Sequence, residues 1–100
     1  MCYGDLKTFV RILPSMSFQF ELTEHARKRI ADRSIPLEWI ERALFHPQKV
    51  EPDQTDLELC SGLVTIPEFG NRVLRVIYNY KVNPPRVVTV YFDRAMKGKL

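Results

Sequence analysis

The chain has 100 residues, of which 45% are hydrophobic and 27% are charged. This length suits one domain and this balance is that of a folded protein, so a two-domain protein and an intrinsically disordered chain are excluded. Fifteen lysines and arginines against twelve acidic residues give a net charge of +3, which permits nucleic-acid binding without demanding it.

The cysteines and the apolar runs bear on where the protein works. Cys2 and Cys60 lie far apart and belong to no Cys-x-x-Cys pair, which favours free thiols in a reducing compartment over a disulfide. The first residues lack the basic region of a signal peptide, and no run approaches the roughly 20 apolar residues of a membrane span. We therefore expect a cytoplasmic protein with no membrane partner.

The first 15 residues differ from the rest of the chain. They show no clear periodicity and end in Pro14 and Ser15, which are typical of a break between segments. We expect residues 1–15 to be a flexible, dispensable extension, or the product of an upstream start codon with Met16 as the natural start. Residues 16–95 would then form a single α+β domain, and residues 96–100 a basic tail.

Residues 18–34 predict a short strand followed by a helix. Apolar and polar residues alternate up to Leu22, as in a strand. Thr23 is a good helix N-cap, and Glu24 suits the positive end of the helix dipole. At a spacing of four residues this helix carries two adjacent stripes, an apolar one of Leu22, Ala26 and Ile30 and a polar one of His25, Arg29 and Arg33.

The remainder predicts a second helix and a sheet. Pro36 fits the first turn of a helix that Pro47 stops at His46, so the two helices form a hairpin with a short link. The periodicity then changes to two. The predicted strands are residues 49–51, 57–66, 72–82 and 86–92, with a bulge at Gly62. Short connections between them imply antiparallel hairpins.

Side-chain alternation in the last two strands predicts a polar sheet face. In the first strand Leu74, Val76, Tyr78 and Tyr80 face one way, and Arg75, Ile77, Asn79 and Lys81 the other. In the second strand Val88, Val90 and Phe92 face one way, and Val87, Thr89 and Tyr91 the other. If the apolar sets pack under the helices, Arg75, Thr89 and Tyr91 meet on an open face. Such a face suits an RNA strand, with arginine on phosphate and a ring under a base; the alternative is a solvated face whose Thr and Tyr reflect strand propensity.

His25 is the histidine placed for chemistry. A helix N-terminus disfavours the imidazolium, which keeps the ring neutral and available as a general base. Arg29 and Arg33, one and two turns further on, are suited to clamp phosphate or to stabilise a phosphorane. The alternatives are a histidine that caps the helix or edges the core, and arginines paired with Asp32, Glu38 or Glu41.

The sequence carries no metal or cofactor motif. Two histidines and two cysteines without paired spacing do not make a metal site. Nothing resembles a phosphate-binding loop, a dinucleotide fingerprint or a hydrolase nucleophile elbow. We therefore expect neither a metal nor a cofactor.

The run from Leu22 to Ile35 resembles a family signature. It fits the pattern T-x-H-A-x-x-R-hydrophobic-x-x-R-x-I of the bacterial domain-of-unknown-function family numbered 4258, and residues 74–78 and 87–91 resemble the closing hairpin of that family. The resemblance covers about residues 17–94. The chain departs from the pattern at Ser34, where the family usually has glycine, and at Pro36, where it often has a helix-capping serine.

This resemblance implies a compact α+β domain, in which an N-terminal strand and a helical hairpin pack on an antiparallel sheet of about four strands. That architecture is similar to the RelE-like ribonuclease toxins and their relatives among colicin-type nucleases. Carried over by position, the residues that the resemblance marks as a site are His25, Arg29, Arg33, Arg75, Thr89 and Tyr91. For contact with RNA we add Lys28, Asn79, Lys81 and Arg94.

The leading functional hypothesis is a toxin-type, metal-independent endoribonuclease. His25 would take the 2′-hydroxyl proton, the arginines would hold the scissile phosphate, Tyr91 would stack on a base or act as the acid, and Thr89 would donate a hydrogen bond. The expected partners are RNA, free or bound to a ribosome, and a cognate antitoxin protein. The competing hypotheses are a non-catalytic RNA- or protein-binding module on the same face, and a small interaction domain that only keeps the fold.

Overall fold

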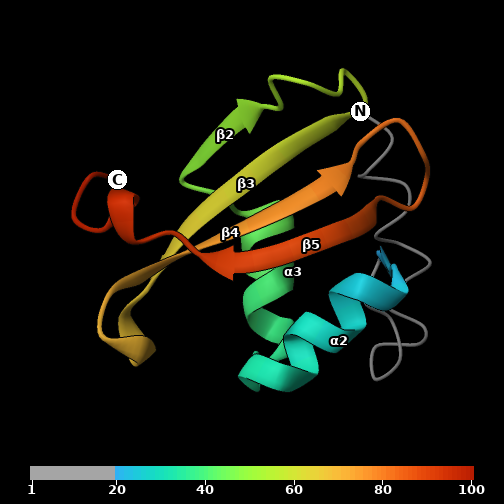
Figure 1. Ribbon diagram of the computed structural model, residues 1–100. Helices are drawn as coiled ribbons and strands as arrows, with labels where there is room; N and C mark the ends of the chain where they lie inside the picture. The colour runs from blue at the N-terminus through green and yellow to red at the C-terminus, as the bar shows by residue number, and fades with distance from the viewer. Residues whose placement is uncertain (1–19) are drawn as a thin grey trace, which may run out of the picture.

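The structure, a computed structural model, describes residues 20–100 of the chain. In chain order its elements are β1 (Glu21–Leu22), α2 (Glu24–Arg33), α3 (Leu37–Phe45), β2 (Lys49–Pro52), β3 (Leu59–Ile66), η2 (Pro67–Phe69), β4 (Arg72–Asn79), β5 (Arg86–Phe92) and η3 (Arg94–Met96). The strands form one sheet in the order β1-β5-β4-β3-β2. The predicted α+β class is confirmed, with two helices packed on a single sheet (Figure 1).

The sheet is mixed and has five strands. β2, β3, β4 and β5 pair antiparallel, as predicted, but β1 pairs parallel with β5, with Glu21 opposite Arg86 and Leu22 opposite Val87. The prediction of an antiparallel sheet of about four strands is confirmed for β2 to β5, and the predicted N-terminal strand adds a fifth strand, β1, in parallel. Alternation along a sequence marks a strand but not its direction, and a parallel pairing joins segments that a long connection separates.

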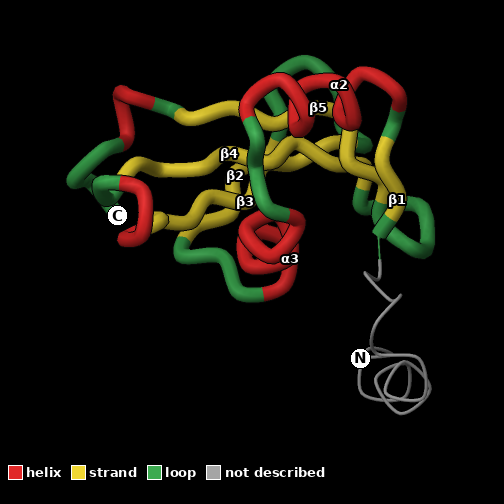
Figure 2. Tube along the Cα trace, turned by 90° about the horizontal axis from the view of Figure 1, so that it is seen from below, coloured by secondary structure: helices red, strands yellow, loops and turns green. Residues whose placement is uncertain are grey.

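The two helices differ in how they meet the sheet. α3 packs across β3 and β4, whereas α2 runs beside β5 at the edge of the sheet (Figures 1 and 2). Between them lies one apolar core, made of Phe20, Ala26, Ile35, Ile40, Ala43, Leu44, Val64, Ile66, Leu74, Val76, Val87 and Val90. Burying each large side chain of this kind stabilises the fold by roughly 1.5–3 kcal/mol. Within residues 20–100 no helix covers the opposite face of the central strands (Figure 1).

A β-bulge in β5 changes which side chains face the core. Ile77 pairs with Thr89 but the next residue, Tyr78, pairs with Val87, so Val88 is the extra residue of the bulge. Val87 is consequently fully buried in the core. The prediction that Val87 shares a face with Thr89 and Tyr91 is wrong, because an inserted residue reverses the alternation on one side of it.

The predicted bulge at Gly62 is also wrong, because β3 runs without interruption through this residue. Gly62 is there for a different reason. A Cβ built on it would collide with the backbone carbonyl oxygen of Ala43 in α3. Glycine therefore lets α3 approach the sheet closely at this crossing.

The caps predicted for α2 are confirmed and extended. The Thr23 hydroxyl accepts a hydrogen bond from the Ala26 N–H at 3.1 Å. At the other end Ser34 has a left-handed backbone, with φ of 53° and ψ of 46°. The N–H of Ser34 donates to Ala31 and that of Ile35 donates to Ile30, which is the Schellman arrangement usually built with glycine.

The ends of several predicted elements differ from the structure. β4 stops at Asn79 rather than at residue 82, and β3 begins at Leu59 rather than at residue 57. The predicted extension, residues 1–15, the start at Met16 and the first part of the predicted strand lie outside the described residues. At the other end the predicted basic tail, residues 96–100, begins inside η3.

Replacing Ser34 with glycine is expected to raise the free energy of unfolding by about 0.5–1 kcal/mol. The substitution removes the unfavourable contact of a Cβ in the left-handed conformation, and this gain exceeds the added entropy of the unfolded chain. Chemical denaturation measures the change. Ala31→Gly, in the right-handed interior of the same helix, is the matched control and should lower stability by about 1 kcal/mol.

Gly62→Ala is expected to lower the free energy of unfolding by about 1–3 kcal/mol, because the new methyl group forces α3 away from β3. Gly70→Ala is the control. Nothing lies within 4 Å of a Cβ at Gly70, and only its φ of 67° opposes a side chain. Equal losses for the two variants would contradict the close approach of α3.

Candidate active site and nucleic-acid interface

His25, in the first turn of α2, contacts the sheet. Its Nε2 lies 3.1 Å from the Oγ1 of Thr89 in β5. The histidine side chain is exposed and Thr89 is partly buried, so a ligand can reach both groups. The two residues are 64 positions apart in the sequence, and only the tertiary fold brings them together.

Thr23 fixes the first turn of α2 against the bulge in β5. Its N–H donates to the carbonyl of Val87 at 3.0 Å, and its hydroxyl donates to the carbonyl of Val88 at 3.1 Å. The same hydroxyl oxygen accepts the capping bond from Ala26. His25 is two residues further along, so these bonds place its ring over the part of β5 that follows the bulge.

Arg29 and Arg33 continue the stripe of His25 along α2. Within residues 20–100 neither forms an ion pair. Arg29 is partly buried, and its Nε is fully shielded without a hydrogen-bond partner. The alternative in which these arginines pair with Asp32, Glu38 or Glu41 is therefore wrong. A half-buried guanidinium without a carboxylate is suited to hold an anion.

Arg75 lies on the open face and its charge is matched by two carboxylates. It contacts Asp93 at 2.8 Å and Glu51 at 3.0 Å, and its side chain is 14% exposed. Burial acts to lower the pKa of Arg75, but the hydrogen bonds to Asp93 and Glu51 outweigh this effect and raise the pKa above its ordinary value. Arg75 thus carries a permanent charge that the protein itself neutralises.

Tyr91 pairs across the sheet with Arg75, and Thr89 precedes it by two residues. The register of β4 and β5 therefore puts Arg75, Thr89 and Tyr91 on the same, open face of the sheet, as predicted. Next to Arg75 and Tyr91 lies a shallow pocket of about 400 Å³. Its other lining residues come from the β2 and β3 region and the neighbouring part of β4, namely Glu51, Pro52, Asp53, Gln54, Thr55, Ser61 and Ile77.

The remaining predicted residues lie in three places. Arg33 and Arg94 line a second pocket, of about 350 Å³, away from the His25–Thr89 contact. Asn79 and Lys81 lie at the turn between β4 and β5: the Asn79 side chain accepts from the Lys81 N–H, and the Lys81 ammonium lies 5.5 Å from the centre of the Tyr80 ring. Lys28 is exposed on α2. The structure does not bring Asn79 and Lys81 to His25, whereas Lys28 lies three residues after His25 on the same helix.

Sequence reasoning missed the residues that neutralise Arg75 and those that complete the second pocket. Glu51, Asp93, Arg72 and Lys97 come from four separate segments. The only signal for them was the run of basic residues after position 93. Strand parity could not reveal Asp93, because it lies just beyond the end of β5.

The described part of the chain holds neither a metal-binding cluster nor a membrane-spanning helix. Among residues 20–100 no group of three or more His, Cys, Asp or Glu side chains is placed to hold a metal ion. In the same residues no helix is long and apolar enough to cross a membrane.

Residues 22–92 match the family model described as Domain of unknown function (DUF4258). The chain belongs to this family. The matched segment begins just before the capping Thr23 and ends with β5, so the DUF4258 region contains His25, Arg75, Thr89 and Tyr91. Arg94 and Lys97 lie beyond it. No curated protein and no solved structure matches the chain.

Replacing Glu51 with glutamine is expected to destabilise this DUF4258 domain near neutral pH, by on the order of 1 kcal/mol. Hydrogen bonds from Arg75 and Lys49 lower the pKa of Glu51 below its ordinary value of 4.5. A lowered pKa gives stability that is present above the unfolded pKa and is lost as the pH falls through the folded one. The difference between wild type and Glu51→Gln should therefore shrink below about pH 4.5 and vanish in stronger acid.

Glu68→Gln is the matched control for this measurement. Glu68 pairs with Arg42 on the surface, where the two side chains are 52% and 35% exposed. Its removal should have the same dependence on pH but a smaller effect, because solvent screens the pair. Denaturant melts from about pH 3 to about pH 8 span the range in which the carboxylate titrates, and a pH-independent loss in Glu51→Gln would contradict the ionic origin of its effect.

Proposed function

We propose that this DUF4258 protein is a metal-independent endoribonuclease of the toxin type, with His25 as the general base. The observation that carries the proposal is the contact of His25 Nε2 with Thr89 Oγ1 at 3.1 Å. It places a solvent-accessible imidazole on the polar sheet face, with the unpaired guanidinium of Arg29 one turn away along α2. A base beside an unsatisfied cation is the arrangement that phosphoryl transfer to an internal hydroxyl requires.

In the proposed reaction the Nδ1 of His25 takes the proton of a ribose 2′-hydroxyl, because the Nε2 of the same ring is engaged with the Oγ1 of Thr89. The 2′-oxygen attacks the adjacent phosphorus, and the bond from phosphorus to the 5′-oxygen breaks as the new bond forms. The 5′-oxygen takes its proton from the hydroxyl of Tyr91, and proton exchange with water restores both side chains. The products are a 2′,3′-cyclic phosphate and a free 5′-hydroxyl.

The spacing of the groups suits this reaction. Thr89 and Tyr91 are two residues apart on one strand, so their side chains leave the sheet about 7 Å from each other. In this proposal the scissile phosphate would lie between His25, which contacts Thr89, and the side chain of Tyr91. Thr89 would position the imidazole by accepting a hydrogen bond from its Nε2–H, and this tautomer leaves the lone pair of Nδ1 free to act as the base.

The cations would divide the work. Arg29 is the guanidinium suited to the developing phosphorane charge, because no carboxylate competes for it. Arg75, already matched by Glu51 and Asp93, would act by fixing Tyr91 and the floor of the face. The fold analogy with RelE-like toxins adds to the proposal a ribosome-bound RNA target and an antitoxin partner.

A non-catalytic RNA-binding module is the second candidate. The observation that favours it is the internal pairing of Arg75, which removes from the sheet face the cation best placed to hold a scissile phosphate. This candidate predicts salt-dependent RNA binding without cleavage.

The test is cleavage of a labelled single-stranded RNA by the purified full chain, in the presence of EDTA. We expect products that end in 2′,3′-cyclic phosphate, and a loss of about 10²–10⁴-fold in rate for His25→Ala. Thr89→Val should slow the reaction less than His25→Ala, because it removes only the group that orients the ring.

His46→Ala is the matched control, because His46 is an exposed histidine at the C-terminal end of α3. It should cleave at the wild-type rate. A rate for His25→Ala equal to that of wild type would remove His25 from the mechanism. If the wild type binds RNA without cleaving it, the nuclease proposal is wrong and the non-catalytic RNA-binding module is the supported function. Growth arrest on induced expression, relieved by His25→Ala at equal soluble protein, is the corresponding test in bacterial cells.

A further inference from the structure

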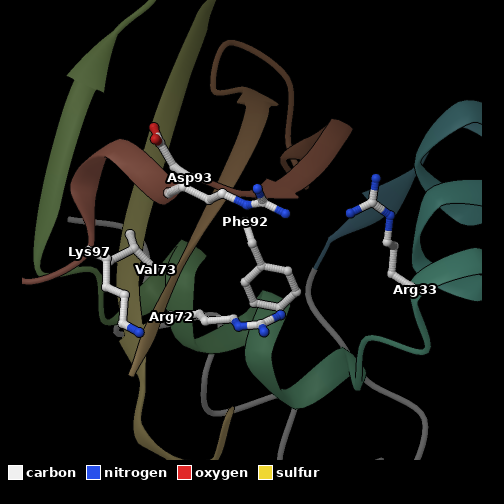
Figure 3. A pocket seen from close by; sticks show the side chains of 7 residues that line it. Arg33, Arg72, Val73, Phe92, Asp93 and Lys97 are labelled. Atoms are coloured by element: carbon white, nitrogen blue, oxygen red, sulfur yellow. The ribbon is translucent and has the colours of Figure 1, made fainter. Parts of the chain in front are cut away.

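A basic pocket forms where β4 begins and β5 ends, at a distance from the His25–Thr89 contact. Its volume is about 350 Å³, and its lining residues are Arg33, Arg72, Val73, Phe92, Asp93, Arg94 and Lys97. They come from the end of α2, the start of β4, the end of β5 and the η3 segment (Figure 3). The four cations are therefore gathered by the fold and not by any one run of sequence.

Within the described residues these cations have no acidic partner. None of Arg33, Arg72, Arg94 and Lys97 takes part in an ion pair there. Other arginines among the described residues do form ion pairs with carboxylates, as in Arg42 with Glu68 and Arg86 with Glu21. Four like charges around one cavity repel one another, and an anion in the cavity would relieve that repulsion.

Asp93, the one acidic residue that lines the pocket, is paired with an arginine outside it. Asp93 contacts Arg75 at 2.8 Å and accepts a hydrogen bond from the Ala95 N–H at 3.0 Å. Its carboxylate points away from Phe92 and from the guanidinium of Arg72 (Figure 3). Asp93 thus orients η3, which carries Arg94, while its own charge is directed to Arg75 and away from the cations of the pocket.

An aromatic surface adjoins the cations. Phe92 packs with Phe69 and Trp39, at 5.1 Å and 6.4 Å between ring centres. The guanidinium of Arg72 lies 4.4 Å from the centre of the Phe69 ring, and Phe92 is only partly buried. Planar guanidinium groups beside partly exposed rings are the combination with which proteins hold single-stranded nucleic acid, by charge on the backbone and stacking on the bases.

The pocket lies in line with the proposed active site. Arg33 is eight residues after His25 on α2, a rise of about 12 Å. Phe92 is three residues after Thr89 on β5, a rise of about 10 Å. α2 and β5 run side by side in the same general direction (Figure 1), with the unpaired Arg29 between the two positions. A strand bound at His25 would reach the pocket along this path.

We propose that this basic pocket binds a backbone phosphate of the RNA strand, outside the linkage that is cleaved. The proposal rests on the proposed function for its ligand, RNA, but not for any step of catalysis. An acidic protein segment would satisfy the charge of the four cations, but the neighbouring rings of Phe92 and Phe69 favour nucleotides. Arg33, Arg72 and Phe92 lie inside the matched family region, and Arg94 and Lys97 lie beyond its end.

The test measures binding of an RNA that cannot be cleaved. A fluorescent 2′-O-methyl oligonucleotide lacks the 2′-hydroxyl proton and cannot be cleaved by the proposed reaction. Its fluorescence anisotropy in the presence of the full chain reports the binding affinity. The double variant Arg33→Ala/Arg94→Ala should weaken binding at least about 10-fold. The slope of log K against log salt should become shallower by about 0.7 for each phosphate that is no longer neutralised. Both arginines are exposed, so thermal melts should confirm that the variant remains folded.

Arg27→Ala/Lys99→Ala is the matched control. It removes the same two charges from exposed positions that do not line the pocket, so it should weaken binding less than about threefold, as expected of screened surface charges. Equal losses of RNA affinity in the two double variants would mean that the pocket cations act only by general electrostatic attraction, and this would overturn the proposal. So would the absence of RNA binding by the wild type, or pocket-dependent binding of a polyglutamate peptide in place of RNA.

Failure of the nuclease function has a different result. In the His25→Ala background, Arg33→Ala/Arg94→Ala should weaken binding of the uncleavable RNA by the same factor as in the wild type, because His25 does not line the pocket. If the wild type cleaves no RNA but binds it more tightly than Arg33→Ala/Arg94→Ala does, the pocket proposal stands and the catalytic proposal is overturned. If Arg33→Ala/Arg94→Ala cleaves RNA with the rate and the substrate affinity of the wild type, the catalytic proposal stands and the pocket proposal is overturned.

Discussion

The candidate site depends on the attachment of one helix end to one strand. Through its backbone and its hydroxyl, Thr23 donates to two consecutive carbonyls of β5, and it also caps α2. These bonds fix the rotation of α2 about its axis as well as its position. His25 must then lie over Thr89, and the arginine stripe must follow the edge of β5. A helix anchored only by its apolar face could roll and carry His25 away from the sheet.

The bulge at Val88 serves the same arrangement. It turns Val87 into the core, where apolar burial holds β5 firmly, and it leaves Thr89 on the polar side within reach of α2. It also presents the Val88 carbonyl to the Thr23 hydroxyl. An irregularity in the strand therefore allows one element to contribute to the core and to the candidate site within three residues.

The arginines of this DUF4258 domain fall into two classes with different consequences. Arg75, Arg42 and Arg86 are paired with carboxylates and act as structural groups. In residues 20–100, Arg29 and Arg33 have no carboxylate partner, and they share this property with Arg94 of η3. Of these, Arg29 is partly buried, and because pairing normally satisfies a charge in that setting, a ligand of opposite charge is expected beside it. The unpaired class, and not the net charge of +3, is what points to a polyanion.

The secondary-structure elements and their caps could be predicted from the amino-acid sequence, because these depend on local chemistry. The Thr23 cap, the apolar faces of both helices, the short link at Ser34 and the four later strands all follow from periodicity and from backbone preference. The polar stripe of His25, Arg29 and Arg33 follows from helical spacing. The parallel pairing of β1 with β5, the bulge and the carboxylate partners of Arg75 could not be predicted in this way. Each of these joins residues far apart in the chain, and their meeting depends on register and packing that no local pattern encodes.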